Sequence, residues 1–490
     1  MQCLALVLSL ALSVLTVGVA QADGARFGAV EAFFAADAAD AASVRWSRIL
    51  VPWERVQPEG PESWNLAIAD GIVDDEVRRG RELVGVLVNT PRWAAETADR
   101  HNTAPPRGLF LPISDPQNVW ASFARRVAAQ YRDRIDTWII WNEPDVTDPH
   151  HAGYAWSGTT AEFVRMQRVA YQAVREGNPR ARLLLPGATY WWDVRLGREQ
   201  FLARYLAIAD KDPEARANGH YFDAVPLQIY TDPFTLFDAP RAYRSILDRY
   251  ALTKPIWITE TNAPIWDDPD RPLTRGHWRA TQREQAAFIV QGYALALAAG
   301  VERISLYKMT EPPTWVPGWE TYGLVRPEDG AVRPGYHALQ TVHRLFGDVT
   351  GGQVWQGNGA VVVQLQESDR RILVAWSRVP RALRLTIPAV AASATVHTAD
   401  GGQMSVSPTS GVYRLDLDPA THDTAVGQPG VYLVGGSPLI IVEPATEPRV
   451  VLTAFHVQPI ANQPVARADA LLADLTSGIR RANRLAVAPR

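Results

Sequence analysis

In Trp138-Ile139-Ile140-Trp141-Asn142-Glu143-Pro144, an apolar, strand-forming run stops abruptly at a glutamate. A second run of this kind, Ile256-Trp257-Ile258-Thr259-Glu260, also ends on a glutamate. Strands buried on both faces, as in parallel sheets, read as near-continuous apolar runs. A carboxylate is costly inside such a core, so we expect each glutamate where its strand emerges.

Around these two runs, short apolar strands alternate with amphipathic helical stretches from Arg26 to about Phe346. The expected strands are Arg26–Val30, Val44–Val51, Leu83–Val88, Thr137–Trp141, Arg182–Pro186, Ala224–Tyr230, Pro255–Thr259 and Arg303–Tyr307. The clearest helical stretches are Asn118–Tyr131, Thr160–Glu176, Gln200–Ala209, Ala239–Tyr250 and Arg279–Ala299. Eight strands with helices between them predict an α/β fold, the (β/α)8 TIM barrel. A doubly wound sheet would carry a glycine-rich phosphate turn after its first strand, and this chain has none there.

The two glutamates suggest the chemistry. In a barrel the carboxyl ends of the strands form one face, where active sites lie. Counting strands places Glu143 on the fourth and Glu260 on the seventh. Two carboxylates that face each other are the minimum apparatus for cleaving a glycosidic bond. One protonates the leaving oxygen, and the other acts as nucleophile or base.

This arrangement resembles the retaining glycoside hydrolases of clan A, whose fourth strand ends in Asn-Glu-Pro and whose seventh ends in a second glutamate. The resemblance covers roughly residues 26 to 346. It is nearest to family 39-like and family 5-like enzymes, from Trp46-Ser47-Arg48, Thr90-Pro91-Arg92-Trp93 and Tyr322-Gly323-Leu324-Val325. It implies a substrate with β-linked sugars, Glu143 as acid/base, Glu260 as nucleophile, and carboxylates about 5–5.5 Å apart.

Three further residues are candidates for the same site. Arg48 would be the positive partner of Glu260, Tyr230 would hydrogen-bond Glu260, and Asn142 would bind the sugar 2-hydroxyl. Two of them have a plainer alternative: a structural salt bridge under the barrel for Arg48, and an ordinary place in the core for Tyr230. The clan often has a histidine two residues before such a tyrosine, and this chain has Gln228.

Aromatic residues are plentiful in the first two thirds of the chain. Of 17 tryptophans, all but Trp355 and Trp376 precede residue 320. Many of them would pack in the core, whereas those after strand ends are candidates for platforms on which sugar rings stack. The substrate-binding candidates are Trp93, Trp191, Trp266 and Trp315, and ordinary loop anchoring is the alternative for each.

Net charge and composition exclude several classes of ligand. A net charge of -3 provides no basic field for nucleic acid or an anionic membrane, so neither is expected. His150-His151 lacks the spacing of a zinc site, and the acidic run 267–270 falls short of a calcium loop. The resemblance implies an oligo- or polysaccharide as substrate, and we expect no cofactor and no metal. The oligomeric state cannot be read from the sequence.

The chain divides into four expected parts. Residues 1–22 have the pattern of a signal peptide with cleavage after Ala22, which predicts a secreted or cell-surface protein. No Lys or Arg precedes its apolar run, so an uncleaved membrane anchor stays open. The only cysteine, Cys3, lies in this segment. Residues 23–347 would form the barrel, 348–445 an all-β sandwich, and 446–490 a tail, either partly disordered or a strand plus a helix.

Expected strands of the sandwich are Ala360–Gln366, Arg371–Trp376, Leu383–Ile387, Ala394–His397, Tyr413–Leu417 and Val431–Val442. Because the sandwich has only two tryptophans, packing against the barrel is favoured over polysaccharide binding. Taken together, the sequence predicts a secreted retaining glycosidase that acts in polysaccharide degradation. The alternatives are a transglycosylase that uses the same residues and a catalytically silent carbohydrate-binding surface protein.

Overall fold

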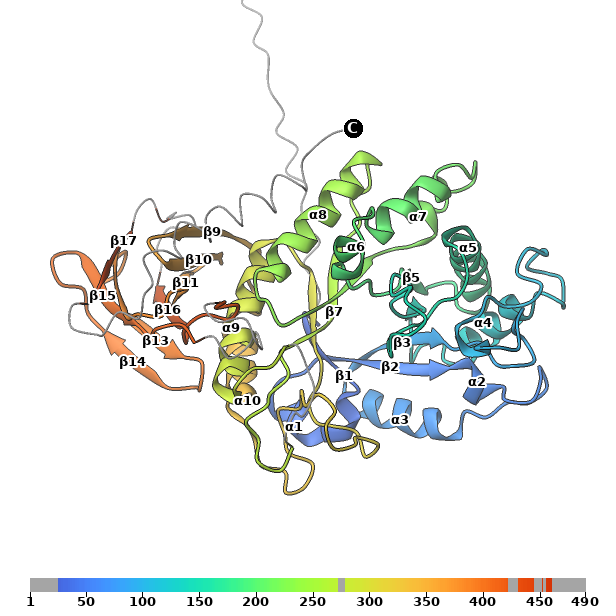
Figure 1. The fold of residues 1–490 in the computed structure, drawn as a ribbon, viewed down its shortest axis with the longest axis horizontal. Helices are drawn as coiled ribbons and strands as arrows, with labels where there is room; N and C mark the ends of the chain where they lie inside the picture. Colours follow the sequence, from blue (N-terminus) through green and yellow to red (C-terminus); the bar gives the residue numbers. More distant parts are fainter. Residues whose placement is uncertain (1–24, 272–277, 422–430, 445–451, 453–454, 461–490) are drawn as a thin grey trace, which may run out of the picture.

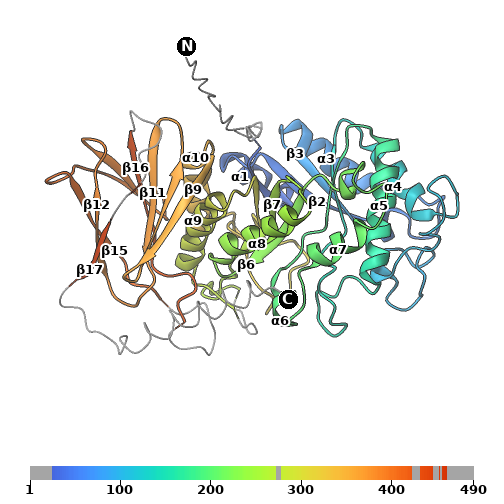
Figure 2. The same ribbon diagram turned by 90° about the horizontal axis from the view of Figure 1, so that it is seen from above.

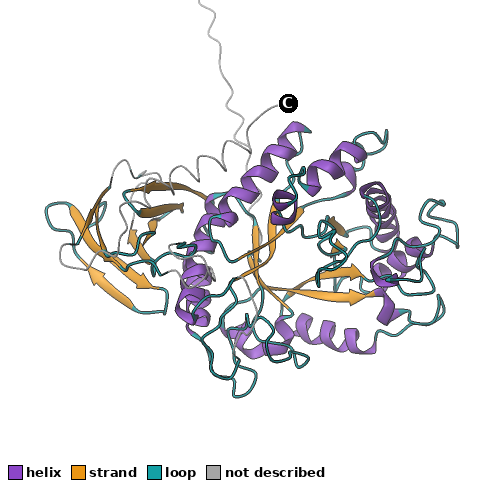
Figure 3. Cartoon of the chain, in the orientation of Figure 1, coloured by secondary structure: helices purple, strands orange, loops and turns teal. Residues whose placement is uncertain are grey.

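A computed structural model of the chain describes residues 25–271, 278–421, 431–444, 452 and 455–460. Figure 1 shows two units side by side, a barrel of strands wrapped by helices and a smaller unit of antiparallel sheets. Figure 3 shows that the helices gather around the barrel. The predicted signal peptide, with Cys3, lies outside the described residues.

The barrel is one parallel sheet of eight strands. They are β1 (Phe27–Val30), β2 (Trp46–Pro52), β3 (Glu82–Val88), β4 (Thr137–Ile140), β5 (Arg182–Leu184), β6 (Val225–Tyr230), β7 (Ile256–Asn262) and β8 (Arg303–Leu306). Their order is β5-β4-β3-β2-β1-β8-β7-β6. Parallel bridges from Leu184 to Ala224 and from Ala188 to Leu227 close the sheet between β5 and β6. This closure confirms the predicted TIM barrel.

Helices cover the outside of the barrel. The longer ones are α1 (Ala36–Ala41), α3 (Ala67–Arg78), α4 (Val119–Gln130), α5 (Thr160–Gly177), α7 (Phe201–Ala209), α8 (Thr235–Arg249), α9 (Gln282–Ala298) and α10 (Pro334–Leu345). Helix α5 begins with a capping box in which Thr159 and Glu162 exchange hydrogen bonds, and Thr281 with Glu284 does the same for α9. Helix α8 begins at Thr235 rather than at the predicted Ala239, so Pro240 lies one turn inside it.

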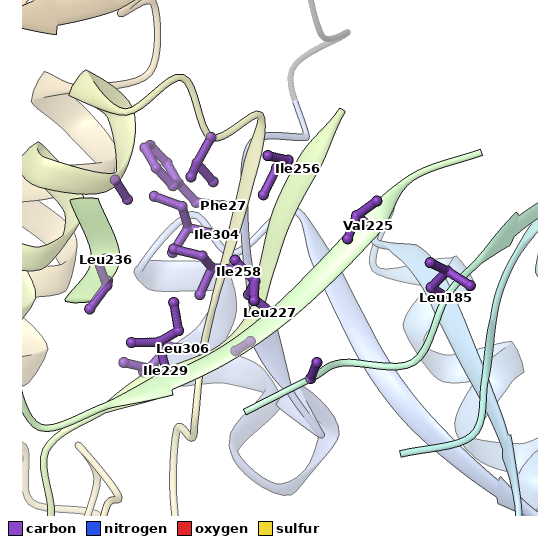
Figure 4. Close-up of a cluster of buried hydrophobic side chains, with 14 of the residues drawn as sticks. Phe27, Leu185, Val225, Leu227, Ile229, Leu236, Ile256, Ile258, Ile304 and Leu306 are labelled. Atoms are coloured by element: carbon purple, nitrogen blue, oxygen red, sulfur yellow. The ribbon is translucent and has the colours of Figure 1, made fainter. Parts of the chain in front are cut away.

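Side chains alternate between the two faces of each barrel strand. Outward-facing residues such as Leu227, Ile258 and Leu306 pack between the strands and the helices (Figure 4). Inside the barrel a separate cluster includes Trp46 and Trp257, whose ring centroids are 5.9 Å apart. These large rings fill the interior, so the barrel is a packed core with no open pore.

Two antiparallel sheets form the second unit. The larger has the order β14-β13-β16-β11-β10-β9 and the smaller β15-β12-β17. The strands are β9 (Gly351–Gly357), β10 (Ala360–Gln366), β11 (Arg370–Ser377), β12 (Leu383–Pro388), β13 (Ala394–Thr398), β14 (Gln403–Val406), β15 (Val412–Leu417), β16 (Leu439–Pro444) and β17 (His456–Pro459). The last strand predicted within 348–445 begins later than expected, at Leu439. Strand β17 lies in the predicted tail, and the rest of that segment is mostly outside the described residues.

The larger sheet packs directly on the barrel helices. Val361, Val374 and Trp376 belong to the same apolar cluster as α9, which lies between the two units (Figure 2). The Gln291 side chain of α9 donates a hydrogen bond of 2.9 Å to the Gly436 carbonyl. Trp376 is fully buried, so it offers no face to a sugar. These contacts agree with the packing role that the sequence favoured. In the described part of the chain, no helix combines the length and apolarity that a membrane span needs.

Candidate active site

Four barrel strands bring polar side chains to one place inside the barrel. Arg48 follows Trp46 by two residues on β2, so both side chains point inward. Gln228 and Tyr230 share the inward face of β6 in the same way. Glu260 comes from β7, and Asn142 follows the end of β4. Gln228, Tyr230 and Glu260 lie in the carboxyl-terminal halves of their strands. Arg48 lies nearer the middle of β2, one inward-facing position beyond Trp46.

The sequence predicts that the strand ends before Glu260, but β7 continues to Asn262. Its pairing with β6 shifts register: Leu227 pairs with Ile258, and Gln228 pairs with Glu260. Thr259 is the extra residue of this β-bulge. Bulges next to active sites re-aim side chains, and this one turns Glu260 into the barrel interior. Apolar patterning could not reveal it because Thr259 looks like any strand residue.

Glu260 is held by three donors. Arg48 forms an ion pair with its Oε1 at 2.7 Å, and Gln228 Nε2 donates to the same oxygen at 2.9 Å. Tyr230 donates its hydroxyl to Oε2. Arg48 and Glu260 are both buried, so this ion pair is shielded from water. Three donors on one carboxylate fix its orientation.

Glu143 is in the opposite situation. Among the described residues, none donates a hydrogen bond to its carboxylate and none forms an ion pair with it. Burial, and then the nearby charges of Glu260 and Asp145, raise the pKa of Glu143 well above its usual value, with Arg48 opposing them. The site therefore contains one carboxylate paired with three donors and one whose acid form is favoured, and glycosidic cleavage uses two carboxyl groups in different roles.

The backbone around Glu143 is in an uncommon conformation. Trp141 has φ of 74° and Glu143 has φ of 44°, both in the left-handed region. For residues other than glycine this region costs free energy and is concentrated at functional sites. The Glu143 N–H donates to the Gly187 carbonyl at 3.1 Å, which ties this turn to the end of β5.

Asn142 links the two halves of the site. Its Oδ1 accepts hydrogen bonds from Arg48 at 2.7 Å and from Gln228 at 2.8 Å. These bonds fix which way the amide points. Its Nδ2 has no acceptor among the described residues, so it remains available to donate to a substrate hydroxyl.

Gln228 is the site residue that the sequence analysis did not include. It lies where the clan often has a histidine, and its single amide nitrogen bridges Asn142 and Glu260. A Cβ on Gly187 would lie 2.6 Å from that nitrogen, so the glycine leaves the space that Gln228 occupies. The signal was available: Gln228 lies two residues before Tyr230 and must therefore share its inward face.

Other tyrosines surround Glu260. The rings of Tyr230, Tyr307 and Tyr322 pack edge-on or tilted, with centroids 5.3–5.7 Å apart. Lys308, after β8, forms a buried ion pair with Glu31 at 3.1 Å. It is therefore already neutralised by a protein carboxylate.

The predicted tryptophan platforms lie in different environments. Trp93 is half-buried and donates to the Gln57 carbonyl at 2.7 Å, as a loop anchor would. Trp191 is 47% exposed and Trp266 is 36% exposed. Arginines lie over Trp266 and Trp315, at 4.7 Å and 4.2 Å from the ring centroids. Whether any of the four binds a sugar stays a prediction. Within the described residues, no three His, Cys, Asp or Glu side chains gather as metal ligands would.

Comparison of the fold with solved structures returns glycoside hydrolases. A family 39 glycoside hydrolase from the gut symbiont Bacteroides cellulosilyticus WH2 superposes with a TM-score of 0.61 at 15% identity, covering 86% of this chain and 82% of that one. A family 30 endoxylanase from Clostridium papyrosolvens C71 gives 0.56 at 11% identity, covering 86% and 96%. A glucosidase from Croceicoccus marinus gives 0.53 at 13% identity, covering 84% and 92%.

These likenesses confirm the fold that the sequence predicted. Each of the three spans both units of this chain, so the resemblance extends beyond the barrel region for which it was expected. No family model and no curated protein matches the sequence itself. At 11–15% identity the shared feature is the architecture, and the chemistry must be argued from the residues.

Proposed function

We propose that this chain is a retaining glycoside hydrolase that cleaves O-glycosidic bonds by double displacement. The observation that carries the proposal is the contrast between two neighbouring glutamates. Glu260 is bound by Arg48, Gln228 and Tyr230, whereas Glu143 has a raised pKa and no hydrogen-bond donor within the described chain. A nucleophile must be ionised, and a general acid must be protonated.

In the first step, Glu260 attacks the anomeric carbon while Glu143 gives its proton to the leaving oxygen. The glycosidic bond breaks, and an ester forms between the sugar and Glu260. In the second step, Glu143, now a carboxylate, takes a proton from a water molecule that attacks the anomeric carbon and releases Glu260. Two displacements on the same carbon retain the anomeric configuration. Asn142 Nδ2 would bind the sugar 2-hydroxyl, an interaction that strengthens in the transition state.

Secretion is part of the proposal. It is supported by the apolar segment 4–20 and the small residues around the cleavage site at Ala22. The substrate would be an oligo- or polysaccharide, and β-linked sugars are the first to test.

The test is hydrolysis of a panel of aryl glycosides by the mature chain and by Glu260→Ala. The panel spans gluco, manno, xylo, galacto, arabino and uronic acid configurations, followed by polysaccharides. Release of aryl alcohol or reducing sugar, lost by several powers of ten in the variant, would support the proposal. No release from any glycoside or polysaccharide would refute it and would favour a carbohydrate-binding protein that has kept the barrel.

A further inference from the structure

The loop after β4 places a histidine beside Glu143. A Cβ built on Gly153 would lie 3.9 Å from Glu143 Oε2 and 3.1 Å from His151 Nδ1, so the acid and the imidazole both lie close to this glycine. The Gly153 N–H donates to His151 Nδ1 at 3.0 Å. Because Nδ1 is the acceptor, the proton of the neutral ring is on Nε2. His151 is exposed, so this N–H can donate to a ligand.

A tryptophan from the next loop packs against that histidine. Trp192 lies on the short helix α6 (Trp191–Arg195), after β5. The rings of His151 and Trp192 meet edge to face, with centroids 4.9 Å apart, and the Arg195 guanidinium lies over the Trp192 ring at 5.3 Å from its centroid. Trp191, the preceding residue, is 47% exposed. An aromatic surface from two loops thus lies next to Glu143.

Buried carboxylates lock these two loops together. Asp145 Oδ2 accepts from both the backbone N–H and the hydroxyl of Thr189, at 2.9 Å and 2.7 Å. Arg198 donates to the Thr147 hydroxyl at 2.9 Å and also pairs with Asp193. Asp145 and Asp193 are fully buried, so this linkage is not loosened by water. The segments Asp145–Thr147 and Thr189–Asp193, from which the two loops extend, are therefore held against each other before any ligand arrives.

We propose that His151 and Trp192 form a subsite for a sugar ring in the leaving group. This inference rests on the proposed function, in which Glu143 must touch the leaving oxygen. Groups beside Glu143 then face the leaving group, whereas Arg48 and Tyr230 surround Glu260 on the nucleophile side. Aromatic rings pack against the C–H faces of sugars, and an imidazole N–H can donate to a hydroxyl, so the half-buried Trp192 and the exposed His151 supply both kinds of contact. The site therefore selects saccharide leaving groups over small ones.

The test compares two substrates that share the sugar identified by the aryl glycoside panel. One is an oligosaccharide, whose leaving group fills the subsite, and the other is the glycosyl fluoride, whose leaving group is too small to reach it. Trp192→Ala and His151→Ala are measured beside Phe110→Ala. Phe110 is a 64% exposed aromatic residue, and the carbonyls of its neighbours Leu109 and Leu111 are held by Arg165 of α5.

We expect kcat/KM for the oligosaccharide to fall about tenfold in Trp192→Ala, and by a smaller factor in His151→Ala. Turnover of the glycosyl fluoride should stay within about twofold of wild type in both variants. Phe110→Ala should change neither. Equal losses on both substrates, or none on either, would overturn this inference alone. A wild-type chain that cleaves neither substrate would overturn the proposed function, and this inference with it.

Discussion

Replacing Gln228 with leucine tests the site at the residue that patterning overlooked. Leucine has nearly the same volume as glutamine but cannot donate. The variant leaves Asn142 Oδ1 and Glu260 Oε1 without the donor that now lies at 2.8 Å and 2.9 Å. Arg48 and Tyr230 still hold Glu260, so the nucleophile remains in place but is less firmly oriented.

The size of the effect follows from the two lost hydrogen bonds. A hydrogen bond to a charged group contributes about 1.5–3 kcal/mol, and one between neutral groups about 0.5–1.5 kcal/mol. If both act fully in the transition state, the barrier rises by about 2–4.5 kcal/mol, which lowers kcat/KM roughly 30- to 2,000-fold. Gln228 Oε1 is buried and has no partner among the described residues, and leucine removes this unpaired acceptor as well. We therefore expect only a small change in Tm.

A matched control exists elsewhere in the fold. Gln291 on α9 is also buried, donates through Nε2 to the Gly436 carbonyl at 2.9 Å, and has an unpaired Oε1 in the described structure. Gln291→Leu should leave kcat/KM unchanged, because its contact faces the sandwich. The assay is aryl glycoside hydrolysis together with thermal unfolding of both variants. Wild-type kcat/KM in Gln228→Leu, or equal losses in both variants, would refute the reasoning.

Three further predictions follow from the same contacts. Gly187→Ala puts a methyl group 2.6 Å from Gln228 Nε2, so steady-state kinetics should show a loss of kcat/KM like that of Gln228→Leu. The double variant with both substitutions should lose little more kcat/KM than either single variant. Because the pKa of Glu143 is raised, kcat/KM should fall as pH rises through it, and the folded state should lose stability above the usual pKa of a glutamate. Glu143→Gln should therefore have a higher Tm than wild type at neutral pH and little advantage at acid pH, as a melting series would show. Ending the chain after Gly347 exposes the helix surface that now buries Trp376, so we expect an insoluble product in a solubility assay. A soluble, active barrel would contradict that packing role.

Much of the barrel could be predicted from apolar runs alone. The strands around Ile139 and Trp257 are buried on both sides, and such runs leave a clear signal in the sequence. Strands at exposed edges leave almost no apolar signal in the sequence. Strand β14 is exposed or half-buried throughout, and no apolar run predicts it. Strand β9, which begins with Gly351-Gly352, was missed for a similar reason.

The site residues that follow from the positions of the strands and from the Asn-Glu-Pro motif could be predicted from the sequence. Glu143, Asn142 and Arg48 follow from the counted strands and the motif, and the structure brings them together with Glu260 and Tyr230. The bulge at Thr259 was not predictable, because register shifts depend on pairing with β6 and not on local composition. Loop contacts such as His151 against Trp192 depend on tertiary packing between segments far apart in the chain.

If Glu260 is the nucleophile of a double displacement, it forms an ester with the sugar, and this ester can be trapped. The chain is incubated with a 2-deoxy-2-fluoro glycoside, with a good leaving group, of the sugar that it hydrolyses. Peptides are then mapped by mass spectrometry. The account predicts one glycosyl group on the peptide that contains Glu260, and none in Glu260→Gln. An adduct on another residue, or no adduct together with a first product of inverted anomeric configuration, would contradict it.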